Sequence, residues 1–222
     1  VFGGSSPDVG PMDDLLLLFL EPGMERVSWR DVGTLGDGPC ARELHTLAIT
    51  PGRPGAPARV LVGGGRGAGG EALRDLYALD TATWMWSRLE DPPSARLGAC
   101  AALISLMKEN EDTHIANNDF MPPPPPPSST TKEEEGVGKS GNMGTAQQEL
   151  WVFGGVDTTA GAISNSLMVY HLGKNCWSAP VLYPVPIERF GHASCCIGET
   201  MYIFGGVNME SDLQDLFSIF TS

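Results

Sequence analysis

Val152-Phe153-Gly154-Gly155 is the stretch of sequence that decides the fold, because its pattern of two apolar residues and two glycines recurs. The other copies are Val1-Phe2-Gly3-Gly4, Leu61-Val62-Gly63-Gly64 and Ile203-Phe204-Gly205-Gly206. Their first glycines lie 60, 91 and 51 residues apart, and the middle gap falls to 50 when a compositionally distinct insert of 41 residues is subtracted. A period of about 50 to 60 residues predicts a repeated supersecondary unit.

Tryptophans and arginines keep the same period. Trp86 and Trp177 each lie 23 residues after the first glycine of their unit, and Trp29 lies 26 residues after Gly3. We expect the glycines to adopt positive φ or to allow close backbone approach, and the tryptophans to fill space between sheets. The residues assigned to this structural motif are Gly3, Gly4, Gly63, Gly64, Gly154, Gly155, Gly205, Gly206, Trp29, Trp86, Trp177, Arg42, Arg96 and Arg189.

Each unit is predicted to hold four short strands, at about 44–50, 58–63, 75–80 and 84–89 in the clearest unit. The apolar-Gly-Gly pattern, Asp75-Leu76-Tyr77, Trp86 and Arg189-Phe190-Gly191-His192 together resemble the kelch repeat. That resemblance implies an all-β fold, a kelch-type β-propeller built from four-stranded blades. Three sites depart from the family pattern. Leu44 stands in place of glycine, Ala99 in place of histidine, and Asp14-Leu15-Leu16 in place of the Asp-Leu-Tyr signature.

The strand count predicts about three and a half four-stranded blades, an incomplete ring that is part of a larger propeller. We expect a partial blade at 1–43, a full blade at 44–96, a second full blade at 97–190 and a partial blade at 191–222. A disordered, proline-rich insert at about 108–148 interrupts the second full blade, because its composition cannot offset the entropy of ordering it. The run Pro122–Pro127 favours polyproline II and could bind a polyproline-binding domain, or could be a tolerated low-complexity loop.

Charge and cysteine content narrow the classes of partner. The chain has 27 acidic and 14 basic residues, a net charge of −13, which argues against nucleic acid as a partner. The longest apolar run, at residues 15–20, is too short for membrane insertion. The five cysteines are scattered and odd in number, a poor disulfide framework. We expect an intracellular location in the cytoplasm, with the cytoskeleton or a cilium as alternatives.

Enzyme motifs are weak. Gly65-Arg66-Gly67-Ala68-Gly69-Gly70 matches a dinucleotide-binding pattern, but the same segment fits the repeat, so we interpret it as a loop between strands. The four histidines lack metal-ligand spacing, and we expect His45 and His192, which occupy a repeat position, to be structural. Nothing marks a nucleophile with its base. The sequence therefore predicts no enzyme activity, no cofactor and no metal site.

Loops between the second and third strands of propeller blades gather on one face, and the family resemblance implies that such loops bind partner proteins. We assign Arg66, Asp157 and Asn208 as partner-binding residues. The predicted function is a non-catalytic protein–protein interaction module or scaffold. Two alternatives stay open: an accessory kelch domain of a larger multidomain enzyme, and a cytoskeletal or ciliary structural scaffold.

Overall fold

A computed structural model describes residues 1–20, 23, 26–106 and 147–220. The described residues contain 18 β-strands and no helix, so the predicted all-β class is confirmed for this part of the chain. Most of the proline-rich insert, with Pro122–Pro127, lies outside the described residues. Gln147 and Gln148, which we had placed in the insert, belong to a strand instead.

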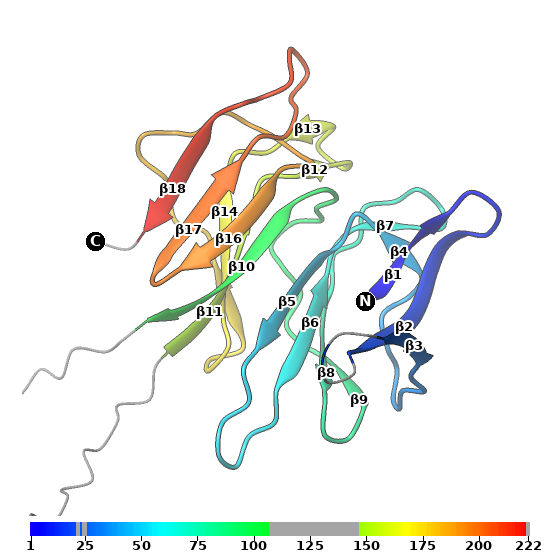
Figure 1. Cartoon of the computed structure of the whole chain (residues 1–222). Helices are drawn as coiled ribbons and strands as arrows, with labels where there is room; N and C mark the ends of the chain where they lie inside the picture. The colour runs from blue at the N-terminus through cyan, green and yellow to red at the C-terminus, as the bar shows by residue number, and fades with distance from the viewer. Residues whose placement is uncertain (21–22, 24–25, 107–146, 221–222) are drawn as a thin grey trace, which may run out of the picture. The chain divides into compact units, whose positions relative to one another are not determined.

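Fourteen of the strands build four larger antiparallel sheets, which we call blades 1 to 4 (Figure 1). Blade 1 holds β1 (Phe2–Ser6), β2 (Gly10–Leu20) and β3 (Val27–Asp31). Blade 2 holds β5 (Thr46–Thr50), β6 (Arg59–Gly63), β8 (Leu76–Asp80) and β9 (Met85–Arg88). Blade 3 holds β10 (Cys100–Leu106), β11 (Gln147–Phe153), β14 (Leu167–His171) and β15 (Cys176–Ser178). Blade 4 holds β16 (Ala193–Ile197), β17 (Thr200–Phe204) and β18 (Leu216–Phe220).

Four further strands have two residues each. β4 (Arg42–Glu43) pairs with β2 of blade 1 and with β7 (Arg66–Gly67), and β12 (Val156–Asp157) pairs with β13 (Ala162–Ile163) as a separate two-stranded sheet. Within each blade the main strands are antiparallel, and the four strands predicted for blade 2 lie within two residues of the observed ones. The four sheets are arranged as the blades of a β-propeller.

Blade 2 is buried on both faces, and its strand sequences reflect this. Leu61 and Ala78 point toward blade 3 and pack with Leu150 and other side chains of that blade. The next residues along the strands, Val62 and Leu79, point the other way and pack with side chains of blade 1. Because both faces are covered, β6 and β8 read as nearly continuous apolar runs instead of alternating polar and apolar residues.

The three repeat tryptophans have different environments. Trp86 is 5% exposed, and its ring meets that of Phe2 edge-on at 5.5 Å between centroids, so it fills the space between blades 1 and 2 as expected. Trp177 is half-buried and donates from Nε1 to the carbonyl oxygen of Glu90 at 2.8 Å. Trp29 is 55% exposed, so the expectation that it packs between sheets is wrong within the described residues.

In blade 2 the repeat glycines lie one residue later in the chain than the sequence pattern predicts. Gly64 and Gly65 have positive φ (61° and 93°) and correspond to Gly154 and Gly155 (68° and 87°), whereas Gly63 ends β6. A Cβ on Gly65 would lie 2.6 Å from the carbonyl oxygen of Glu43, so only glycine fits there. Three consecutive glycines hid this shift, because Gly63 and Gly64 are the two that directly follow the apolar pair Leu61-Val62.

Two of the repeat arginines are fully buried and paired with carboxylates. Arg42 donates from Nη1 and Nη2 to the two carboxylate oxygens of Asp75 at 2.6 and 2.8 Å, and Arg189 binds Asp215 in the same way at 2.7 and 2.8 Å. Each guanidinium also donates to a repeat-glycine carbonyl, that of Gly64 at 3.0 Å for Arg42. Bidentate pairing satisfies the charge that burial would otherwise penalise.

Arg42→Met is expected to destabilise the protein by about 3 to 5 kcal/mol, because it leaves the largely buried carboxylate of Asp75 without its partner. The free energy of unfolding, measured in urea by tryptophan fluorescence, gives the loss. Arg88→Met is the matched control: Arg88 pairs with Asp91 on the surface, and its removal is expected to change stability little. Equal losses for both variants would contradict the importance of the buried pair.

Candidate functional site

The loops that join the second and third strands of each blade are held at one end of the sheets. They span residues 64–75 in blade 2, 154–166 in blade 3 and 205–215 in blade 4, and we call this end the loop face. Each loop pairs with the segment entering its own blade: β7 with β4, Val156 with Leu97, and Val207 with Phe190. Figure 1 shows β7, β12 and β13 at the other end of the sheets from Leu106, where β10 ends, and Gln147, where β11 begins.

Adjacent loops also touch each other. The backbone N–H of Ala72 in the blade 2 loop donates to Oγ1 of Thr158 in the blade 3 loop at 3.3 Å. The backbone N–H of Gly65 donates to the carbonyl oxygen of Arg96 at 2.7 Å, and Gly155 does the same to Arg189 at 2.8 Å. Main-chain bonds therefore tie the loops of blades 2 and 3 to the blade that follows, which joins the loops of blades 2 to 4 into a continuous surface.

Arg66 lies in β7 on this face. Its side chain is 46% exposed, and its guanidinium donates from Nε to Oε1 of Glu43 at 2.8 Å. The pair joins the two short strands β4 and β7 across the surface. Arg66 therefore remains accessible to a partner while its side chain is held in place by Glu43.

Asp157, the second predicted binding residue, has a structural task. Its carboxylate accepts from Nη1 of Arg96 at 2.8 Å and from the backbone N–H groups of Thr159 and Ala160 at 3.0 and 3.1 Å. Burial would raise the pKa of Asp157, but these donors outweigh it and hold the pKa below the ordinary value. The side chain is 17% exposed, so little of it can reach a partner.

The position of Ser166 explains why Arg96 uses Asp157. Ser166 occupies in blade 3 the place that Asp75 has in blade 2, since Gly154 and Gly64 donate to their carbonyl oxygens at 3.2 and 3.1 Å. Serine offers Arg96 only a hydroxyl, at 3.3 Å. The carboxylate that binds the repeat arginine therefore belongs to a loop residue, Asp157, in blade 3, and to Asp75, at the start of the third strand, in blade 2.

Asn208 shapes the loop of blade 4. Its Oδ1 accepts from the backbone N–H groups of Glu210 and Ser211, both at 2.9 Å. This turn holds Met209 at the tip, where it is 87% exposed. Within the part of the chain that the structure describes, no hydrogen bond or ion pair joins the side chains of Arg66, Asp157 and Asn208 to one another. The sequence located the loops, but it missed exposed tips such as Met209 and Val9, because an exposed side chain leaves no mark in the repeat pattern.

The repeat position Leu44, Gly98 and Gly191 forms a chain of hydrogen bonds across three blades. The N–H of Gly98 donates to the carbonyl oxygen of Leu44 at 2.9 Å, and the N–H of Gly191 donates to that of Gly98 at 2.8 Å. All three residues have positive φ, of 55°, 64° and 66°. Leu44 is therefore a departure in residue type that keeps the backbone conformation of the repeat.

His45 and His192 pack their rings on a phenylalanine of the preceding blade. The ring centroids are 5.6 Å apart for Phe2 and His45, and also for Phe153 and His192, with edge-on geometry. Neither ring nitrogen of His192 has a hydrogen-bond partner among the described residues. Burial, together with the positive charge of Arg189, lowers the pKa of His192 to about 4.

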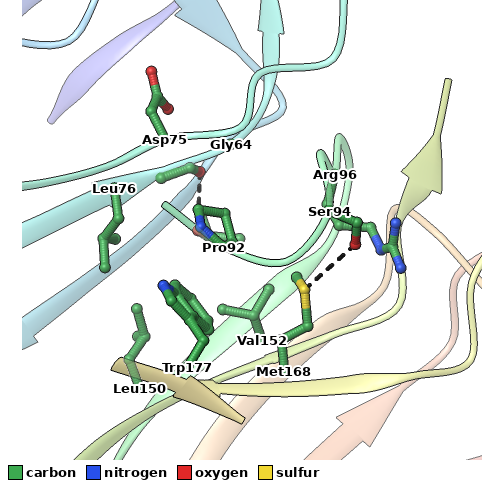
Figure 2. Close-up of a pocket in the computed structure, with 12 residues that line it drawn as sticks. Gly64, Asp75, Leu76, Pro92, Ser94, Arg96, Leu150, Val152, Met168 and Trp177 are labelled. Atoms are coloured by element: carbon green, nitrogen blue, oxygen red, sulfur yellow. Dashed lines mark hydrogen bonds between the residues drawn. The ribbon is translucent and has the colours of Figure 1, made fainter. Parts of the chain in front are cut away.

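Figure 2 shows a small cavity between blades 2 and 3. Leu76, Leu150, Val152 and Trp177 line it with apolar surface, and Oγ of Ser94 donates to Sδ of Met168 at 3.6 Å at its edge. Its volume is about 20 Å³, room for about one water molecule. Sites for metabolites are typically at least about 300 Å³, so this cavity is too small for one.

The dinucleotide-like stretch 65–70 is a loop, as interpreted from the repeat. Arg66 and Gly67 form β7, and the N–H of Gly67 donates to the carbonyl oxygen of Glu71 at 3.0 Å. Across the described ranges, no group of three His, Cys, Asp or Glu side chains is arranged to hold a metal. In the same residues no helix has the length and apolarity needed to cross a bilayer.

Comparisons with known proteins point to kelch repeats. The chain is 27% identical over 192 residues to the Rab9 effector protein with kelch motifs of Bos taurus, covering 84% of this chain and 41% of that protein. It is 41% identical over 70 residues to Kelch domain-containing protein 3 of Bos taurus, covering 31% of this chain and 17% of that protein.

A third similarity is to a protein whose name describes an enzyme. The chain is 35% identical over 72 residues to N-(sulfonatooxy)prop-2-enimidothioate sulfolyase of Thlaspi arvense, covering 32% of this chain and 21% of that protein. No protein-family model matches the chain. The chain thus spans less than half the length of each of these relatives.

Lowering the pH from about 6.5 to about 4 is expected to destabilise the fold through His192. In that window the unfolded chain binds a proton at this residue, with its ordinary pKa of 6.5, whereas the folded chain does not. The loss approaches about 3 kcal/mol at the acid end. Unfolding free energies of the wild type and of His192→Gln, measured across this range, check it. Parallel pH profiles for the two proteins would refute the assignment to His192.

Proposed function

We propose that this chain, whose relatives include proteins named for kelch motifs, acts as a module that binds partner proteins through its loop face. The observation that carries the proposal is the continuity of that face: loops of successive blades are tied to one another through Ala72 and Thr158 and through the repeat-glycine N–H groups. A surface fixed in this way loses little conformational entropy when a partner binds.

Exposed loop residues are the proposed contacts. Arg66 offers a charged group, Thr158 and Thr159 offer hydroxyls, and Met209 offers an apolar tip that is 87% exposed. Asp157 and Asn208 contribute mainly by holding the loops that present these side chains. A flexible methionine beside polar and charged groups suits a protein surface better than a small molecule.

The type of partner is supported by one relative. The Bos taurus protein that matches most of this chain carries a name that describes it as an effector of Rab9. By analogy we propose a folded protein as the partner of the loop face. Nucleic acid remains disfavoured by the net charge of −13.

A scaffold role would use a second surface. The chain leaves blade 3 after Leu106 and returns at Gln147, and these two residues are register partners at the end of the sheet opposite the loop face. A polyproline-binding domain that recognised Pro122–Pro127 would therefore act through a segment that departs from the other end of this blade. This second partner is part of the proposal, and Pro122–Pro127 lies outside the described residues.

The proposed compartment is the cytoplasm, with the cytoskeleton or a cilium as alternatives. All five cysteines are free, including the neighbours Cys195 and Cys196. Unpaired thiols are typical of reducing compartments.

The similarity to the sulfolyase favours a second candidate, a kelch domain that serves a larger enzyme. That similarity covers only about a third of the chain. The two candidates differ in what the loop face contacts: a separate protein, or a substrate-bearing part of the same enzyme.

The double variant Arg66→Glu, Met209→Asp is expected to weaken partner binding by about tenfold or more, because both side chains lie on the loop face. The probe is a set of small folded binding domains selected from a phage-displayed library against the wild-type chain, with affinities measured by interferometry.

Lys174→Glu is the matched control. It reverses one charge in the exposed turn between β14 and β15, at the end of blade 3 opposite the loop face. Its binding is expected to equal that of the wild type. If the selected binders lose affinity for the control and keep it for the double variant, the loop face is not the binding surface.

A further inference from the structure

Three polar side chains on neighbouring strands of blade 3 form a hydrogen-bonded relay. Nδ1 of His171 lies 2.9 Å from Oε1 of Glu149, and Nε2 of His171 lies 2.8 Å from Oγ of Ser178. The residues come from β14, β11 and β15. They share one face of the sheet, because Glu149 pairs with His171 across the strands, and Ser178 pairs with Val169, two residues before His171.

The carboxylate of Glu149 is fixed by further donors. Its Oε2 accepts from Nε1 of Trp151 at 2.9 Å, and its Oε1 accepts from Nε2 of Gln147 at 3.1 Å. The Glu149 side chain is 8% exposed. Because the indole and the amide can only donate here, both carboxylate oxygens act as acceptors, and His171 must donate from Nδ1.

That tautomer leaves Nε2 of His171 as the acceptor for the hydroxyl of Ser178. The His171 side chain is 19% exposed, and Ser178 lies exposed on the outermost strand of the blade. The order is therefore a buried acid, an oriented imidazole and an accessible hydroxyl. This is the arrangement in which histidine removes the proton of a serine that attacks an acyl group.

The relay is not required by the blade fold. Blade 2 carries Arg59 and Asp80 where blade 3 carries Glu149 and His171, and its Ser87 corresponds to Ser178. Oγ of Ser87 donates to the carbonyl oxygen of Ala78 at 3.3 Å instead of to an imidazole. The same strand geometry thus forms without the relay, and Ser87 provides a matched control within the chain.

We propose that Ser178 is a nucleophile activated by His171, that Glu149 positions the imidazole, and that the site takes acyl groups from small esters. Oγ of Ser178 bonds to the ester carbonyl carbon while its proton passes to Nε2 of His171. The bond to the leaving alcohol then breaks, and that oxygen receives the proton from His171. A water molecule then attacks the acyl carbon while His171 takes its proton. The bond to Oγ of Ser178 breaks, Oγ receives that proton, and the carboxylic acid is released, so ester and water are the only reactants consumed.

Ser178 has an open approach, so activated, unhindered esters are the expected substrates. This chemistry goes beyond the proposed partner binding and is independent of it. It uses the face of blade 3 near the free end of β11, and none of its residues lies in the loops of the loop face.

The test is labelling of the intact chain with a fluorophosphonate, in which Oγ bonds to phosphorus and fluoride leaves. Peptide mass spectrometry is expected to find the label on Ser178 in the wild type and in Ser87→Ala. Ser178→Ala is expected to carry none. His171→Gln is expected to label roughly 100-fold more slowly, because the general base is gone. Release of p-nitrophenol from p-nitrophenyl acetate should follow the same order.

Glu149→Gln separates positioning from stability. It keeps the shape of the side chain but removes the charge that fixes the tautomer of His171, so labelling should slow about tenfold or more. Melting temperatures show whether each variant is folded. A folded His171→Gln that labels at the wild-type rate, or a wild type whose Ser178 stays unlabelled, would overturn the proposal.

Discussion

An arginine guanidinium bound to a carboxylate is the interaction on which blades 2, 3 and 4 depend. Arg42 and Arg189 are fully buried, and neither could remain so without Asp75 and Asp215. The hydrogen bonds and charge of Asp75 hold the pKa of Arg42 above its usual value although burial lowers it, so the charge persists. Because the same guanidinium binds a repeat-glycine carbonyl, it also fixes where the second strand ends and the loop begins.

Blade 3 shows that the repeat arginine needs a carboxylate partner, but that this carboxylate need not come from one fixed position in the repeat. Its arginine, Arg96, finds a carboxylate in the loop at Asp157, because Ser166 stands at the usual aspartate position. The loop of blade 3 is consequently held by an ion pair, whereas that of blade 2 leaves Arg66 to pair with Glu43 on the surface. A single difference in residue type at the strand entry thus changes how the loop is anchored.

The repeat made the fold predictable, since glycine pairs, tryptophans and arginines each mark a strand end or an interface. The repeat pattern could not predict the features in which one blade differs from another. The glycine register slipped in blade 2 because Gly63, Gly64 and Gly65 are chemically identical, and Trp29 was given a packing role that its exposure contradicts. Glu149 and His171 are 22 residues apart on different strands, so no local motif could have joined them.

These differences between blades lie where the fold tolerates them. Core positions such as Leu61 and Leu150 are packed from two blades and leave little freedom, because a change in volume there costs stability directly. A change of side chain at a strand end or a loop tip costs little stability, because the arginine ion pairs and the hydrogen bonds of the repeat glycines already hold the backbone there. Function in a repeat of this kind is therefore expected at positions where one blade departs from its neighbours, as blade 3 does at His171, at the end of the sheet opposite the loop face.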